Sequence, residues 1–180
     1  KIISNKFVFE ELLRAKLLFN QNLTIKISLN SAKVENNKLF DKLKFNLNIR
    51  DGKIDMNNSS LISDKVGSLK LSNSKINFVD NELMFFGKMK FDIIDQSQFY
   101  KIFQIPKKNR KIIKKLFFDV KFNFLKEELK IINIQLNDNL NNNLNVTNEL
   151  ILDNDKKNNS INNWIDLKKF TNNLMENYEG

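Results

Sequence analysis

The 180-residue chain contains no cysteine and no histidine. Without cysteine it can form no disulfide, no thiolate metal site and no cysteine nucleophile. With histidine absent as well, a zinc site would lack its usual ligands, and a Ser-His-Asp triad is excluded. The missing cysteine does not decide the redox compartment. These absences argue against an enzyme, and we expect neither a catalytic centre nor a cofactor or metal.

Glycine and proline are scarce, with 4 residues and 1 residue respectively. This excludes a collagen-like array and a flexible linker. No apolar run reaches the roughly 18 residues that a membrane-spanning helix needs. The chain begins at Lys1 and shows no signal peptide. We therefore interpret it as the C-terminal part of a longer protein.

The net charge is +9, from 30 basic and 21 acidic residues. A basic balance can favour nucleic acid or anionic lipid, but the lysines are spread along the chain, as on a solvated surface. One true basic cluster occurs, at 107–115. Phenylalanines near it recur at every second position and do not alternate with the cations as a stacking platform would. We therefore expect no nucleic-acid partner.

Alternation of apolar and polar residues is the main pattern that is present. In the stretch 43–50, Leu43, Phe45, Leu47 and Ile49 fall on one face and polar residues on the other. Roughly nine or ten such segments follow one another with short connections. The sequence therefore predicts a mainly β fold, an antiparallel β-meander that forms a long curved and twisted sheet.

Turn residues separate the predicted strands. Asp51-Gly52 is typical of a tight hairpin, and 79–83 and the "LKEEL" stretch predict two more turns. The "SNS" sequence at 72–74 predicts a break within a strand.

Three segments depart from the alternation. The stretch 9–19 is either a short helix or a helix-to-strand transition. The stretch 95–115 predicts a helical insert that begins at an N-cap, Asp95 or Ser97, and is interrupted by Pro106. The last, 161–180, carries apolar residues at helical spacing and predicts an amphipathic helix. We expect this last helix to cover the sheet edge opposite the insert.

The order of these elements from 67 to 136 resembles the C-terminal region of bacterial AsmA-like proteins. The features that carry the resemblance are Gly87 between two strand halves, the aromatic pair Phe99 and Tyr100, the Lys108 and Arg110 step, and the strand pair 118–136. The upstream segments also look like the repeating units of that family. The resemblance covers about three quarters of the chain, 7–136.

AsmA-like proteins are envelope proteins with an inner-membrane helix and a periplasmic β-rich body related to bridge-type lipid carriers. The resemblance implies an apolar β-groove that binds or conducts phospholipid between the two membranes and supports outer-membrane biogenesis. It implies a periplasmic location and an inner-membrane anchor in a part of the parent protein outside this chain. The alternative is a scaffold with a closed β core that assists outer-membrane protein assembly.

These expectations define domains and candidate residues. The β-groove domain is 1–136 with its helical insert at about 95–115, followed by a polar loop or weak edge strand at 137–160 and the helix at 161–180. The expected groove lining is Leu43, Phe45, Leu47, Ile49, Leu69, Leu71, Ile76, Phe78, Met89, Phe91, Ile93, Phe118, Val120, Phe122 and Phe124. The expected headgroup contacts are Lys107, Lys108, Arg110, Lys111, Lys114 and Lys115.

Overall fold

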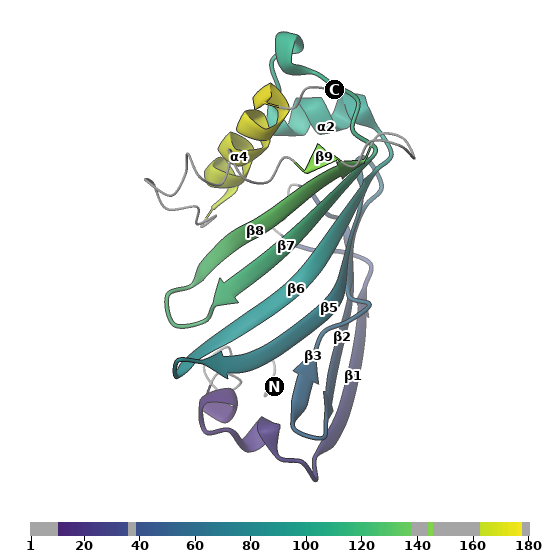
Figure 1. Cartoon of the computed structure of the whole chain (residues 1–180). Coiled ribbons are helices and arrows are strands. Elements are labelled where there is room, and N and C mark those ends of the chain that lie inside the picture. The colour runs from purple at the N-terminus through teal and green to yellow at the C-terminus, as the bar shows by residue number, and fades with distance from the viewer. Residues whose placement is uncertain (1–10, 36–38, 138–143, 146–162, 178–180) are drawn as a thin grey trace.

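The structure is a computed structural model that describes residues 11–35, 39–137, 144–145 and 163–177. Nine strands in this part of the chain form one antiparallel sheet, which confirms the predicted meander. They are β1 (Thr24–Ser31), β2 (Lys42–Arg50), β3 (Lys53–Asp55), β4 (Ser60–Ser63), β5 (Gly67–Val79), β6 (Glu82–Ile93), β7 (Lys115–Asn123), β8 (Glu128–Asn137) and β9 (Leu144–Asn145). The sheet is strongly curled (Figure 1).

Two hairpins turn through residues with positive φ. Asp51 and Gly52 (φ 51° and 71°) join β2 to β3, and Asp80 and Asn81 (φ 50° and 61°) join β5 to β6. Two successive left-handed residues match the twist of the flanking strands. Both turns lie where the sequence predicted them.

The strand between β2 and β5 is split into two parts. β3 pairs with one half of β2, β4 pairs with the other half, and both pair with β5. Ser59 fills the gap, since its Oγ accepts from the Asn46 N–H at 2.9 Å. Ser74 Oγ accepts from the Met56 N–H at 2.7 Å. These side chains satisfy backbone groups that an unbroken ladder would otherwise pair.

Irregularities in β5 and β8 keep the apolar residues on one face. The β5–β6 register shifts between Ser72 and Lys75, at the break predicted from the sequence. Apolar residues occupy odd positions before this bulge and even positions after it. In β8, Ile132 is the extra residue, because Ile131 and Asn133 pair with consecutive residues of β7. One added residue switches which positions of a strand, odd or even, point to a given face. Each bulge therefore keeps the apolar residues on the same face although their positions change from odd to even or from even to odd.

The insert contains helix α2 (Gln96–Phe103) and the single 3-10 turn η2 (Lys107–Asn109). Asp95 is the N-cap, and its carboxylate accepts from the Gln98 N–H at 3.0 Å. Gln104 ends α2 in the left-handed conformation, with φ 57°. The chain then runs through Pro106 and η2 directly into β7, so 107–115 forms a turn that leads to the strand and no second α-helix.

Helix α4 (Trp164–Asn177) packs on α2. The Phe103 and Trp164 rings lie 5.4 Å apart, and Asn172 Nδ2 donates to the Phe103 carbonyl oxygen at 2.8 Å. The expectation that α4 would cover the opposite edge is therefore wrong, because both helices lie at the same end of the sheet (Figure 1). We call it the helical end.

The N-terminal segment covers the opposite end (Figure 1). Residues 11–14 are helical, and η1 (Leu17–Phe19) is a 3-10 turn. Leu13 and Leu18 are buried against the sheet. Apart from β9, the predicted polar loop and weak strand at 137–160 lie almost wholly outside the described residues.

Candidate functional site

One face of the sheet carries most of its apolar side chains, and we call it the inner face. The cross-strand partners Ile49 and Ile25, and Phe85 and Phe122, illustrate it. Paired residues of an antiparallel ladder project to the same side, so the pairing carries this face from β1 to β8. All fifteen residues predicted to line a groove lie on it.

These fifteen residues differ in exposure. Seven are buried under other parts of the protein: Leu47, Ile49, Leu71, Ile76, Phe91, Ile93 and Val120. Eight are partly exposed: Leu43, Phe45, Leu69, Phe78, Met89, Phe118, Phe122 and Phe124. In this conformation only the second group offers surface to a ligand.

The helical end of the inner face is closed by the protein itself. Phe99 is 1% exposed and contacts the ring of Phe91 at a centroid distance of 6.2 Å. Phe40 approaches Phe91 at 6.1 Å from another side. Leu174 and Met175 of α4 complete the same cluster. Phe91 is thus a core residue, although its strand pattern is that of a groove residue.

The opposite end is covered by the N-terminal segment. Leu13 and Leu18 belong to a second cluster with Ile54 and Leu83. The Phe19 ring lies 5.5 Å from that of Phe78. This cover was not predicted, because the sequence indicated a helical segment but not which surface it would meet.

A line of apolar residues crosses the strands along the second cluster, which includes Leu71 and has Phe45, Met89 and Phe118 packed against it. Leu29 pairs with Phe45, and Leu71 pairs with Met89, which pairs with Phe118. We call these five residues the central stripe. Leu29 is 49% exposed, Leu71 is buried, and the other three are partly exposed. The stripe spans five strand spacings from β1 to β7, or about 24 Å at 4.8 Å each.

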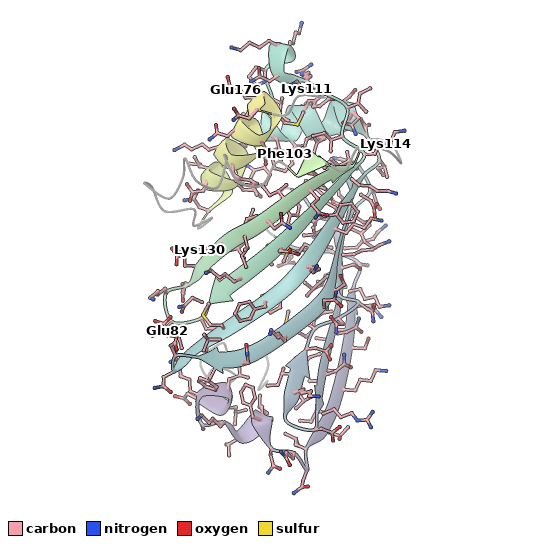
Figure 2. All side chains as sticks on the ribbon, viewed as in Figure 1. Glu82, Phe103, Lys111, Lys114, Lys130 and Glu176 are labelled. Carbon is pink, nitrogen blue, oxygen red and sulfur yellow. The ribbon has the colours of Figure 1, made fainter. Side chains whose placement is uncertain are left out.

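The six predicted headgroup contacts lie at or beside the helical end, where Figure 2 shows Lys111 and Lys114. Lys107, Lys108, Lys114 and Lys115 are exposed. Arg110 is held in place, because its Nε donates to the Ile105 carbonyl oxygen at 3.1 Å and its guanidinium lies over the Tyr100 ring at 5.4 Å. Lys111 is partly buried. The four exposed lysines are the cations best placed to meet an external anion.

A polar cavity of about 140 Å³ lies on the outer face, at the end of β6, β7 and β8 away from the helices. Figure 2 shows Glu82 and Lys130 there. Lys126 Nζ lies 2.9 Å from Glu82 Oε1, and Asn123 Nδ2 donates to Glu82 Oε2 at 2.6 Å. The hydrogen bond from Lys126 lowers the pKa of Glu82 and in turn raises the pKa of Lys126. The sequence did not indicate this group, because Glu82 lies more than 40 positions before Asn123 and Lys126.

The outer-face group is best explained as a set of side chains that stabilise the β7–β8 turn. Asn123 Oδ1 accepts from the N–H groups of Leu125 and Lys126 at 2.9 and 3.1 Å, which fixes the β7–β8 turn. Its amide then positions Glu82, and Glu82 positions Lys126. Both glutamates that line the cavity have lysine partners, Glu82 with Lys126 and Glu128 with Lys130. Such exposed ion pairs contribute little stability and supply no poised acid or base.

Among the described residues, no group of three or more acidic side chains is arranged to hold a metal ion. No helix in the described ranges is long and apolar enough to cross a membrane. No protein-family model, curated protein or solved structure matches the chain. A functional assignment therefore rests on the geometry of the inner face and the helical end.

Proposed function

We propose that this chain is a segment of an AsmA-like envelope protein whose inner face binds the acyl chains of phospholipid. The observation that carries the proposal is the central stripe, where Phe45, Met89 and Phe118 stay partly exposed although they pack against the second cluster. Single exposed apolar side chains are ordinary, but several that align across neighbouring strands are typical of a surface that receives an apolar partner.

The size of the stripe suits an acyl chain. One chain spans about one leaflet, or half of the roughly 30 Å hydrocarbon core of a bilayer. The stripe, at about 24 Å, can therefore hold one chain lengthwise. Each methylene group that leaves water gains about 0.8 kcal/mol. A chain in contact over only half of its surface would still gain several kcal/mol, with no catalytic group required.

The two closed ends constrain how lipid would reach the stripe. Phe99 and Met175 close one end and Leu13 and Leu18 close the other, so a chain would enter from the open side, between the covers. Passage along the whole face would require one cover to move. We accordingly propose binding as the activity of this conformation, and conduction between inner and outer membranes as an activity of the parent protein. Its location would be periplasmic, with an inner-membrane anchor elsewhere in that protein.

A second candidate function is favoured by the same two clusters. If the partly exposed residues meet only the protein's own segments, the domain is a non-enzymatic scaffold with a closed β core, which assists outer-membrane protein assembly through contacts. The two functions differ in whether lipid occupies the stripe.

The test is mass spectrometry of lipid that co-purifies with the chain expressed in a bacterial envelope, after mild detergent and extensive washing. We expect phospholipid at near-fixed stoichiometry, and its loss in Phe118→Asp. Leu29→Asp is the second variant, because Leu29 is 49% exposed whereas Phe118 packs against both clusters. The matched control is Phe86→Asp, which places the same charge on the outer face of the neighbouring strand β6. Phe91→Asp is unsuitable, because a charge among Phe40 and Phe99 would unfold the helical end.

A folded, lipid-free wild-type protein would favour the scaffold. Equal lipid retention by Phe118→Asp and Phe86→Asp would also contradict binding on the stripe. Circular dichroism melts establish that each variant is folded before its lipid content is compared.

A further inference from the structure

Two isoleucines at the helical end point into solvent. Ile94 is 71% exposed and Ile112 is 62% exposed. Ile94 directly follows β6 and Ile112 lies three residues before β7. The Ile93 N–H donates to the Lys114 carbonyl oxygen at 2.9 Å, which continues the β6–β7 pairing and brings the two segments together.

The packing of their neighbours fixes these side chains outward. Ile93 is 7% exposed and Ile113 is 0% exposed, and both belong to the cluster at the helical end. The Ile113 N–H donates to Gln96 Oε1, and Gln96 Nε2 donates back to the Ile113 carbonyl oxygen. The backbone N–H and carbonyl of Ile113 are therefore both hydrogen-bonded to Gln96 of α2, which holds the segment around Ile112 in place. Ile112 cannot turn inward without displacing Ile113.

Positive charge predominates around the exposed isoleucines, since Asp92, which lies across the ladder from Lys115, and Asp64, which precedes Lys65, are each paired with another lysine. Residues 94–115 contain seven lysines or arginines and one acidic residue, Asp95, whose carboxylate is engaged as the cap of α2. Lys114 and Lys115 are exposed beside Ile112. The Ile94 N–H donates to the Val66 carbonyl oxygen at 2.8 Å, so the exposed Lys65 of the β4–β5 turn adds another cation near Ile94.

Exposed aliphatic side chains within a field of lysines match one kind of partner. An anionic bilayer surface takes apolar groups among its headgroups and attracts cations at the same depth. Lysine stems can lie along that boundary while their ammonium groups reach phosphate. Nucleic acid fits less well, because isoleucine offers no ring on which a base could stack.

We propose that this part of the helical end is a docking surface for an anionic bilayer, with Ile94 and Ile112 inserted among the headgroups. Lys107, Lys108, Lys114 and Lys115 contact the lipid phosphates. The proposal does not rest on acyl-chain binding by the inner face, and either can hold without the other.

Co-sedimentation with vesicles of phosphatidylcholine, with and without phosphatidylglycerol, tests the surface. We expect binding to the anionic vesicles only. Replacing both isoleucines, Ile94→Ser with Ile112→Ser, should weaken the partition coefficient at least tenfold through lost apolar contact. Lys114→Gln with Lys115→Gln should weaken it roughly 30-fold at low salt.

The chain offers close controls for both pairs. Leu17 and Leu125 are 59% and 60% exposed, and both lie away from the helical end, so Leu17→Ser with Leu125→Ser should leave partitioning unchanged. The control for the lysine pair is Lys26→Gln with Lys53→Gln, because both of these lysines are also exposed. Each variant is checked for folding by circular dichroism.

Three results would overturn the proposal. The first is an equal loss of binding in the test pairs and their controls. The second is binding of a single-stranded RNA probe that competes with vesicles and depends on the lysines but not on the isoleucines, which would indicate a general polyanion site. The third is loss of vesicle binding in a folded Phe118→Asp variant, because the inner face would then be the surface that meets lipid. Retained vesicle binding in that variant supports the docking surface, whatever its lipid content after purification.

Discussion

Phe99 is the side chain whose removal most directly tests the closure of the helical end. It is 1% exposed, and its ring lies 4.8 Å from that of Phe103 and 6.2 Å from those of Phe91 and Tyr100. Truncating a buried phenylalanine to alanine costs about 3–5 kcal/mol, through lost transfer free energy and the cavity left behind. We expect Phe99→Ala to lower the free energy of unfolding by about 4 kcal/mol.

That loss is large compared with the total stability of a typical domain, about 5–15 kcal/mol. For a chain of this size it corresponds to a fall in Tm of about 8–16 °C. The matched control is Phe86→Ala, because Phe86 is partly exposed on the outer face with Lys75 over its ring at 5.2 Å. The control should cost about 1 kcal/mol, mainly in strand propensity.

The assay is urea unfolding followed by two probes. Fluorescence of Trp164, the single tryptophan, reports on the helical end, since its ring packs on Phe103. Circular dichroism reports on the sheet. We expect coincident transitions, because Phe118 and Ile131 contact both hydrophobic clusters and link them. Equal costs for Phe99→Ala and Phe86→Ala would refute the closed end, and separate transitions would refute the linkage.

Three further predictions concern single positions. Gly67→Ala should cost about 3 kcal/mol or more, because Gly67 has φ 147° and an added Cβ would lie 1.9 Å from the Asp92 carbonyl oxygen; near-wild-type urea unfolding would contradict this. Asn77→Val should stabilise the fold by about 1 kcal/mol, because Asn77 Oδ1 is buried with no hydrogen-bond partner among the described residues; a lower urea midpoint would refute it. The pKa of Glu82 is lowered from 4.5 and that of Lys126 is raised from 10.5, chiefly by their mutual hydrogen bond. The stability from this pair should therefore be present between these values and be lost as the pH falls below 4.5 or rises above 10.5. Because the pair is exposed and contributes little stability, Glu82→Gln should make both slopes only slightly shallower in a series of urea melts, and steeper slopes would contradict the assignment.

Local patterns were enough to predict the sheet. Alternation places Phe118 and Phe122 on one face of a strand whatever the rest of the molecule does. The turn at Asp51-Gly52 follows from the backbone freedom of glycine and the left-handed tolerance of aspartate. Most connections between neighbouring strands are short, so most of the strand order also follows from the chain, with the insert between β6 and β7 as the long exception.

The exposure of individual residues on the inner face could not be predicted in this way. Phe91 and Phe122 have the same alternating context, yet Phe91 is 5% exposed and Phe122 is partly exposed. The difference comes from Phe99, which packs on one and not on the other, and from contacts of α4 that join residues about 70 positions apart. Periodicity describes a single element and carries no information about which distant element covers it.

The sequential order of the sheet has a consequence for synthesis on the ribosome. The main path of strands runs in chain order from β1 to β9, so each long ladder needs only a segment already made and the one that follows it. Such short-range closures carry a small entropic cost and allow early folding while the chain is still growing. The helical end differs, because Phe99 and Phe103 stay without their α4 partners until Trp164–Asn177 has been made. Those two phenylalanines therefore add to the apolar surface through which the nascent chain can aggregate until α4 is made.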